Sequence, residues 1–466
     1  MKNVVMKFGG TSVADADAIR RLMAIVTAQA AKSGAPPVVV VSAMSKVTDQ
    51  LLRMTADASR GERATITSGI EEIRQRHLAA IEALVPSPAR EKVVAEVEQQ
   101  IEELRAMLTA LAILREASPR SCDGIAAGGE LLSSRIVAGA LQAAGLGAAW
   151  VDARTAIVTD DQYTVAAPLT VETAEALQRS VAPHLAAGLI PVLGGYVGAT
   201  RDGVATTLGR GGSDYSAAII GAGLGVAEIQ IWTDVDGMLT ADPRVVRDPR
   251  VVAHLSFGEA SELAYFGAKV LHPSTILPAV STEIPVRILN SRRPEAPGTL
   301  ITAKPPVNDR PIVALACKRN ITVVEVTSTR MLMAHGFLRR LFEVFERYRT
   351  AVDVVTTSEV SVSVTIDDDR RLQDIARGLR EFAEVTIEPE MALLCAVGEN
   401  LRVDPAFAIR MLAGLDGVPL RMVSQAASRR NVTVVIRDSD LPAAMSRLHN
   451  AWFAVSTVAT PVEATR

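Results

Sequence analysis

Short, almost continuous runs of valine, isoleucine and leucine recur through the first 300 residues and alternate with longer segments of helical pattern. The runs are NVVMKF, PPVVVVSA, GLIPVLGGY, EIQIWTD and IPVRILN, each bounded by glycine, proline or charged residues. Strands that are apolar along their whole length belong in a mostly parallel sheet with helices on both faces. This pattern therefore predicts an α/β domain that ends near residue 305.

Residues 57–119 interrupt the alternation. The segments EEIRQRHLAAIEAL and VVAEVEQQIEELRAMLTALAIL carry apolar residues at spacings of three and four, which is typical of amphipathic helices. A dimerising coiled coil is one interpretation, but the heptads are few and irregular. We therefore expect a helical excursion within the first domain.

A second domain region follows a proline-rich segment, SRRPEAPGTLITAKPPVNDRP, which we interpret as a linker. Beyond it lies an internal repeat. SVSVTIDD begins at Ser361 and NVTVVIRD at Asn431, and Phe337 and Phe407 show the same offset of 70 positions. Each copy has the pattern strand, helix, two strands, helix, so we expect a pair of related modules.

Size and composition exclude several classes of protein. A chain of 466 residues is expected to form two or three domains. A net charge of −3 disfavours a nucleic-acid partner. The three cysteines have neither disulfide-framework nor zinc-site spacing, which favours a reducing cytoplasm. No leader pattern and no run long enough to cross a bilayer is present, so we expect no membrane partner.

The stretch TTLGRGGSDYSAA is the most informative candidate site. Its glycines allow backbone N–H groups to face an anion, and Arg210 adds a planar two-point clamp for a carboxylate or phosphate. Ser213 or Asp214 is placed to cap the helix that follows. An ordinary helix-start turn is the alternative interpretation.

Other candidates lie at strand and helix ends. Lys7 stands before two glycines in VVMKFGGTSVAD, and Thr233 and Asp234 end the run EIQIWTD, where open α/β sheets bind ligands. Glu130 in GGELLSS and Lys269 in FGAKVLHP are ambiguous by themselves. A first-turn glutamate and a lysine that reaches the surface are their ordinary structural explanations.

The candidate residues favour one kind of chemistry. None of the six histidines stands at metal-ligand spacing with another histidine or a cysteine, and no serine lies in a G-x-S-x-G turn. Lysines, an arginine, glycine-rich turns and a few carboxylates remain. They suit phosphoryl transfer to a nucleophile that needs no deprotonation, such as a carboxylate.

Taken together, the motifs resemble the aspartate kinase family in order and over nearly the whole chain: KFGGTSVAD, VSAMSKVTDQLL, GGELLSS, TTLGRGGSDYSAA, WTDVDG, TADPRVV, FGAKVLHP and VDVVTTSEVSVSVTID. The resemblance implies a three-layer α/β/α amino-acid-kinase domain over residues 1–305, followed by two ferredoxin-like βαββαβ ACT domains over 310–388 and 391–466. It also implies conversion of L-aspartate and ATP into 4-phospho-L-aspartate, the entry step to lysine, threonine and methionine.

The resemblance further implies roles for individual residues. Lys7 would contact the reacting oxygens, with Gly9 and Gly10 as amide donors, and Asp214 and Lys269 would complete the catalytic set, with Lys269 reaching toward the phosphates. Glu130 would hold the substrate ammonium. The aspartate-binding positions are Thr48, Glu130, Arg210 and Ser213. The ATP positions are Thr233, Asp234, Leu239, Arg244 and Lys269, of which Leu239 stands where many family members carry tyrosine. Mg²⁺ would arrive with ATP.

The segment VDVVTTSEVSVS resembles the lysine-inhibited form of the family. Amides at the start of a helix near Gly336 would receive the effector carboxylate, and Asp353 or Glu359 its ammonium. The expected effector positions are Met331, Gly336, Phe337, Leu338, Asp353, Ser358 and Glu359. Threonine and a joint response stay open as alternatives, and so does a solvated strand end with no ligand. The family further implies a homodimer through the ACT domains.

Two other functions compete with this interpretation. One is a different amino-acid kinase, which acts on glutamate or acetylglutamate. The other is an amino-acid sensor with an inactive kinase domain, although Lys7, Glu130, Arg210 and Lys269 are all present. A bifunctional enzyme with a homoserine dehydrogenase half is not expected from the length of the chain.

Overall fold

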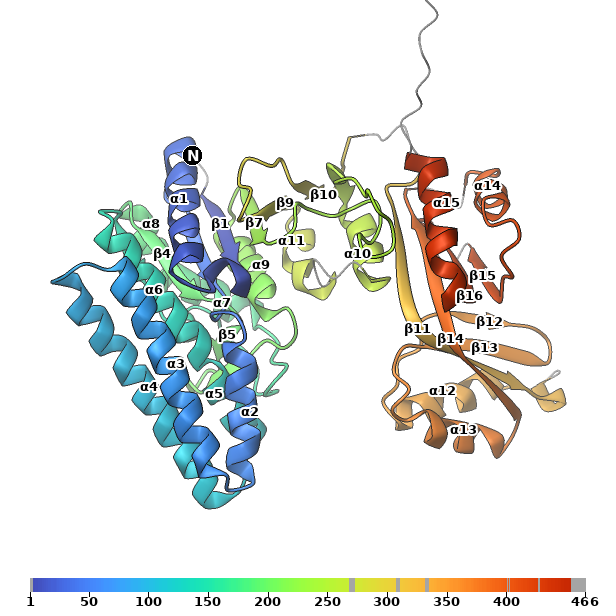
Figure 1. The fold of residues 1–466 in the computed structure, drawn as a ribbon, viewed down its shortest axis with the longest axis horizontal. Helices are drawn as coiled ribbons and strands as arrows, with labels where there is room; N and C mark the ends of the chain where they lie inside the picture. Colours follow the sequence, from blue (N-terminus) through green and yellow to red (C-terminus); the bar gives the residue numbers. More distant parts are fainter. Residues whose placement is uncertain are drawn as a thin grey trace, which may run out of the picture. The chain divides into compact units, whose positions relative to one another are not determined.

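The chain forms two compact units in the computed structural model (Figure 1), which describes residues 3–267, 273–306, 311–331, 335–399, 401, 403–425 and 428–453. The first unit comprises Met1–Met238, Ala253–Phe257 and Val270–Pro305, and the second comprises Leu239–Val252, Gly258–Lys269 and Pro306–Arg466. No helix among the described residues is long and apolar enough to cross a membrane.

An eight-stranded sheet forms the centre of the first unit, in the order β3-β4-β2-β1-β7-β9-β10-β8. Neighbouring strands from β3 to β9 are parallel, β10 is antiparallel to β9, and β8 is parallel to β10. The five predicted runs became β1 (Val4–Phe8), β2 (Val38–Val41), β4 (Ile190–Gly194), β7 (Glu228–Thr233) and β9 (Val286–Asn290). The remaining strands are β3 (Ala148–Trp150), β8 (His254–Ser256) and β10 (Thr299–Thr302).

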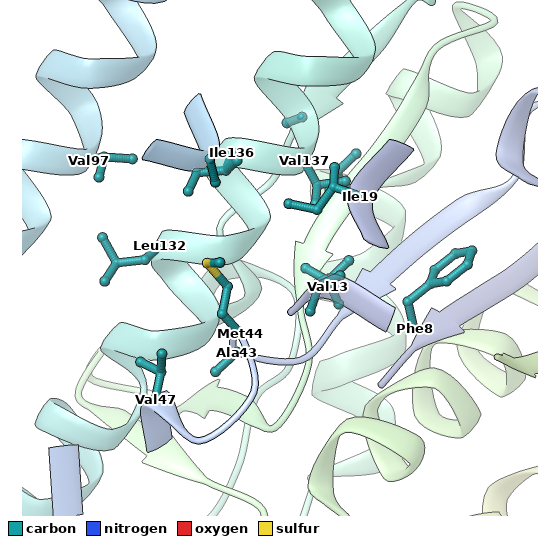
Figure 2. Close-up of a cluster of buried hydrophobic side chains, with 14 of the residues drawn as sticks. Phe8, Val13, Ile19, Ala43, Met44, Val47, Val97, Leu132, Ile136 and Val137 are labelled. Carbon is teal, nitrogen blue, oxygen red and sulfur yellow. The ribbon is translucent and has the colours of Figure 1, made fainter. Parts of the chain in front are cut away.

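The central strands are buried on both faces, as their continuous apolar sequence predicts: every residue of β1, β2 and β4 is buried. Met6 and Phe8 lie in one core with helices α1 (Ala16–Ser33) and α6 (Gly128–Ala143), which Figure 2 shows around Phe8, Val13 and Ile136. Successive side chains of a strand point to opposite faces. Lys7 therefore points to the other face, where α9 (Gly212–Leu224) contacts β1 and β2. The predicted α/β class is confirmed.

The helical excursion also folds as expected. It forms α3 (Arg63–Leu84) and α4 (Ala89–Leu114), and α2 (Val47–Ser59) and α5 (Pro119–Ala126) flank it. The apolar faces of α3 and α4 pack against each other and share the core of α6 through Ile73, Val97 and Leu104. Because this core is continuous with that of the sheet (Figure 2), the helices belong to the first unit and need no partner to bury their apolar faces.

Two segments differ from the sequence prediction. The proline-rich segment predicted as a linker contains β10, because Thr299–Thr302 places Ile301 in the core and pairs with both β8 and β9. The described residues of 239–252 and 258–269, predicted within the first domain, belong to the second unit, and Ala241 and Val246 join its core.

A six-stranded antiparallel sheet forms the second unit, in the order β12-β13-β11-β14-β16-β15. Its strands are β11 (Ala314–Thr327), β12 (Val355–Thr357), β13 (Ser361–Ile366), β14 (Glu384–Val397), β15 (Met422–Gln425) and β16 (Asn431–Arg437). Its helices after residue 310 are α12 (Phe337–Arg347), α13 (Leu372–Arg380), α14 (Phe407–Ala413) and α15 (Leu441–Phe453). The predicted repeat is present, since α12 and α14 begin 70 residues apart, as do β13 and β16.

The two copies of the repeat interleave, although the predicted ranges 310–388 and 391–466 divide them along the chain. The end of β11 pairs with the start of β14, and the start of β11 pairs with the end of β14. Val324 and Val326 therefore pack with α12 and α13, whereas Leu315 and Cys317 pack with α14 and α15. Each half of β11 thus lies beside a different half of β14, because the two 14-residue strands pair in antiparallel register.

Candidate active site

A cavity of about 430 Å³ lies at the carboxyl edge of the central strands, where β1 has β2 on one side and β7 on the other. The loops that follow parallel strands meet at this edge, so the point where strand order reverses is the expected ligand site of such a sheet. The cavity is lined by Lys7, Ser42, Thr48, Glu130, Thr164, Tyr196, Gly209, Arg210, Gly211, Gly212, Ser213 and Asp214. All four predicted aspartate-binding residues are among them.

An ion pair joins the central strand to the helix that follows the glycine-rich turn. Lys7 Nζ lies 2.6 Å from Asp214 Oδ1, and the two side chains are only 10% and 14% exposed. Asp214 is in the first turn of α9, where the helix dipole favours a carboxylate. The pair therefore holds an ammonium group at the cavity wall, where it is available to an anionic ligand.

Glu130 lies in the first turn of α6 and is buried. Burial raises the pKa of its carboxyl from 4.5 to about 8, although backbone hydrogen bonds at Ala43 and at Glu130 itself, and the charge of Lys7, act in the opposite direction. Its Oε2 has no hydrogen-bond partner among the described residues. A cation that enters the cavity would satisfy this oxygen and stabilise the ionised carboxylate.

The glycine-rich turn has the backbone that its sequence suggests. Gly209 and Gly211 have φ values of 74° and 73°, a left-handed conformation that favours glycine, and Arg210 stands between them. The Arg210 side chain is exposed and, among the described residues, forms no ion pair. Its guanidinium is therefore free to bind a carboxylate at the mouth of the cavity.

A second cavity of about 440 Å³ contains the other predicted loop residues. It shares Ser42, Thr48 and Glu130 with the first cavity and is also lined by Gly9, Gly10, Thr11, Ala43, Met44, Ser45, Lys46, Asp49, Thr233 and Asp234. The loops after β1 and β2 approach closely here, because a Cβ atom on Gly10 would lie 3.1 Å from the Ala43 carbonyl oxygen. The structure thus brings Gly9, Gly10, Thr233 and Asp234 together.

Two predicted nucleotide residues, Leu239 and Arg244, are not among the described residues that line these cavities. Leu239 and Arg244 belong to the second unit, where Arg244 Nη2 pairs with Asp242 Oδ2 at 2.6 Å. Lys269 lies outside the described residues. The nucleotide contacts of Leu239, Arg244 and Lys269 therefore stay predictions from the sequence.

The predicted effector residues lie in the second unit. Gly336 has a φ of 84° and precedes α12, while Met331 and Phe337 pack on the core beneath that helix. Leu338 and Glu359 are exposed, and Ser358 bonds to Ser361 within its own turn.

Asp353 is the effector residue with the most unusual surroundings. Its side chain is only 4% exposed, and its Oδ1 accepts a hydrogen bond of 2.8 Å from Lys318 Nζ. Its Oδ2 is buried and has no hydrogen-bond partner among the described residues. Lys318 also pairs with Asp367 at 3.2 Å. Asp353 is thus a buried carboxylate that already accepts from one lysine ammonium.

Sequence reasoning missed several residues of these sites. Ser42 and Tyr196 lie at the carboxyl ends of the predicted runs PPVVVVSA and GLIPVLGGY, so the pattern indicated their place at the carboxyl edge of the sheet. Thr164 and Lys318 carry no such signal. Thr164 reaches the cavity from a loop, and Lys318 meets Asp353 only through the pairing of the strands around it.

Comparisons with known proteins identify relatives of the whole chain. The amino acid kinase family model matches residues 2–290, and an ACT domain model matches residues 394–452. Aspartokinase 1, chloroplastic, of Arabidopsis thaliana is 35% identical over 467 residues, which cover 96% of this chain and 80% of that protein. Lysine-sensitive aspartokinase 3 of Escherichia coli is 35% identical over 462 residues, which cover 97% and 99%.

Solved structures agree with the sequence comparisons. Escherichia coli aspartokinase III in complex with lysine and aspartate superposes with a TM-score of 0.83 at 35% identity, covering 97% of this chain and 100% of that one. The same enzyme in complex with aspartate and ADP gives a TM-score of 0.81 with equal identity and coverage.

Proposed function

This chain belongs to the amino acid kinase family, and within it to the aspartokinases, and from this premise we propose how its residues carry out the reaction. The enzyme transfers the γ-phosphate of ATP to the β-carboxylate of L-aspartate and forms 4-phospho-L-aspartate, the first step toward lysine, threonine and methionine. The observation that supports its chemistry best is the cavity that joins the Lys7–Asp214 pair, buried Glu130 and Arg210, which forms no ion pair among the described residues.

L-aspartate presents two carboxylates and one ammonium group, and the first cavity offers a matching set of charges. We assign the α-carboxylate to Arg210, the ammonium to Glu130 and the polar contacts to Thr48 and Ser213. Glu130 has an unpartnered oxygen, and its burial disfavours the ionised form in the free enzyme, so the substrate ammonium would stabilise the ionised carboxylate as an ion pair. This arrangement leaves the β-carboxylate for the region of Lys7.

We place the phosphates of ATP at the second cavity, against the backbone of Gly9 and Gly10 and beside Thr233 and Asp234. Leu239, Arg244 and Lys269 stay predicted nucleotide contacts from the family resemblance. Mg²⁺ bound to the nucleotide phosphates would supply charge neutralisation, and we assign it no protein ligand. The solved relative with aspartate and ADP supports the use of this pair of ligands.

The chemical step needs no general base, because a carboxylate is already ionised at neutral pH. The protein must align two anions and neutralise their repulsion while charge spreads over the transferred group. Lys7 is placed for this task, since it lies at the cavity wall and its charge is held by Asp214. Asp214 therefore acts by positioning Lys7.

We also propose that lysine inhibits the enzyme at the second unit, with the effector ammonium at Asp353 and its carboxylate near the amides after Gly336. The lysine-sensitive relative and its lysine complex support this assignment. Asp353 already binds the ammonium of Lys318 and has a second oxygen to offer. Threonine stays the alternative effector. A homodimer through the ACT domains and a cytoplasmic location remain predictions from the sequence.

The test is formation of an acyl phosphate from ATP and aspartate, trapped as the hydroxamate with hydroxylamine. We expect product with aspartate and none with glutamate or acetylglutamate. Product with the latter acids alone would replace the proposal with another amino-acid kinase, and no product with any acid would favour a sensor. Initial rates with lysine and threonine, added separately and together, identify the effector.

A further inference from the structure

We propose that Arg76, on α3, is a positioning residue that holds together the two loops of the nucleotide cavity. These are the first loop, residues 9–15 after β1, and the second loop, residues 42–46 after β2. The inference rests on the proposed function for its effect on activity. Under this proposal, the helical excursion helps to position the active-site loops, a role that neither the sequence motifs nor the cavity lining indicates.

One guanidinium group bonds to both loops. Arg76 Nη1 donates to the Ser45 carbonyl oxygen at 2.7 Å, and Nη2 donates to the Ala14 carbonyl oxygen at 2.8 Å. The two acceptors lie 31 and 62 residues from Arg76 in sequence. Arg76 forms no ion pair among the described residues. Within that part of the chain, Nη1 and Nη2 therefore bond to these two carbonyl oxygens and to no carboxylate.

Each of the two loops is fixed at its start by a hydrogen bond to a neighbouring strand and near its other end by Arg76. The first loop is tied at its start by Gly9 N, which donates to the Trp232 carbonyl oxygen at 3.1 Å. The second loop is tied at its start by Ser42 N, which donates to the Phe8 carbonyl oxygen at 3.0 Å. Both starts are thus continuous with the sheet, and Arg76 anchors each loop near its other end.

The loops also depend on each other. The absence of a side chain at Gly10 lets the Ala43 carbonyl oxygen approach closely, and Gly129 makes similar room for the Ala43 side chain. Both loops line the cavity that we assign to the phosphates. A shift of either loop would therefore move the amide donors on both sides of that cavity, and displacements of about 1 Å are enough to reduce rates severely.

The geometry requires arginine. Two carbonyl oxygens on different loops need two N–H donors held in a fixed plane, which a guanidinium supplies and an ammonium does not. Lysine at this position keeps the charge and most of the aliphatic stem but loses the planar pair of donors.

Arg74 offers a matched control on the same helix. It is part-buried and bonds to Glu98 and Glu71 within the helical excursion, with a distance of 2.6 Å from Nη2 to Glu98 Oε1. None of its described hydrogen bonds reaches either loop. Arg74→Ala thus removes a guanidinium of similar burial from α3 and leaves the loop attachment intact.

The experiment compares Arg76→Ala, Arg76→Lys and Arg74→Ala by hydrogen–deuterium exchange, melting temperature and steady-state kinetics of the full chain. We expect Arg76→Ala to raise exchange in peptides that cover residues 9–15 and 42–47, and to lower kcat/KM for ATP about 10- to 100-fold. Arg76→Lys should lie between it and the wild type. Added guanidinium ion should restore part of the activity of Arg76→Ala and have no such effect on Arg74→Ala.

The proposal is overturned if exchange in both loops is the same in Arg76→Ala and Arg74→Ala, or if both variants lose activity only in proportion to a lower melting temperature. Should Arg76→Ala not fold, Arg76→Lys against Arg74→Ala decides the same question. A wild type that forms no acyl phosphate from aspartate refutes the proposed function, whereas the exchange comparison still tests Arg76 by itself.

Discussion

Each unit of the molecule contains a shielded pair of lysine and aspartate, and these two pairs serve opposite purposes in our proposal. Lys7 and Asp214 are 2.6 Å apart at a cavity wall, and Lys318 and Asp353 are 2.8 Å apart in the second unit. In the first pair the lysine is the functional group, which must meet an incoming anion. In the second pair the aspartate is the functional group, which must meet an incoming ammonium.

The surroundings of the two pairs explain the difference. Lys7 faces a cavity with glycine-rich turns and a neighbouring arginine, which favour an anionic ligand. Lys318 has a second carboxylate, Asp367, within 3.2 Å, so it keeps a partner when Asp353 is taken by another cation. A lysine–aspartate pair can thus serve an anionic or a cationic ligand. Which ligand it serves depends on whether the neighbouring groups favour an anion at the lysine or give the lysine a second carboxylate partner.

The largest effect is expected from the first pair. Lys7→Ala should lower kcat by about 10²- to 10³-fold, the usual loss for one preorganised donor that stabilises transition-state charge. Hydroxamate formation measures it, and Lys32→Ala, an exposed lysine in the last turn of α1, is the control. An unchanged rate for Lys7→Ala would remove Lys7 from the mechanism and end the comparison.

Glu130→Gln should raise the KM for aspartate by about 10- to 100-fold, because it removes a charge-assisted contact to the substrate ammonium. The pH profile is a sharper readout. Glu130 must be ionised to bind the ammonium and has a pKa of about 8 in the free enzyme. We therefore expect kcat/KM for aspartate to rise with pH through about 8 in the wild type, and this rise to be absent in Glu130→Gln. A flat wild-type profile would contradict the assignment.

The same carboxyl predicts how stability depends on pH. Its pKa is higher in the folded state, about 8, than its ordinary value of 4.5, so the folded state binds more protons between these values. The stability of the wild type should therefore fall as pH rises through this window, by at most a few kcal/mol, on the order of 1.4 kcal/mol per pKa unit. Glu130→Gln should lack this contribution. Urea unfolding of both proteins at pH 5 and pH 9, without ligand, measures the difference.

The smallest effect is expected at the second pair. Lys318→Met removes the internal competitor for Asp353, so half-inhibition should need about three- to tenfold less lysine, which corresponds to the net contribution of one typical hydrogen bond. Arg319→Met is the matched control, since Arg319 pairs with Asp438 and not with Asp353. Asp353→Asn should weaken inhibition by lysine. Equal lysine sensitivity of Lys318→Met, Arg319→Met and the wild type would show that Lys318 does not compete with the effector for Asp353.

Local patterns in the sequence determined most of the fold. Continuous apolar runs identified five strands of the large sheet, spacings of three and four identified α3 and α4, and the 70-residue offset identified the repeat. The motifs also indicated Lys7, Glu130, Arg210 and Asp214 before their positions were known. These elements and motif residues can be predicted from sequence because each depends on neighbours within one turn, one strand or one repeat.

Only the tertiary structure decided which distant residues meet. The bonds of Arg76 to Ala14 and Ser45, the pairing of Lys318 with Asp353 and the exchange of β11 between two cores join segments that no local pattern relates. The raised pKa of Glu130 has the same origin, because burial depends on everything packed around the side chain. Periodicity is a property of short segments, whereas these contacts depend on strand order and register across the whole unit.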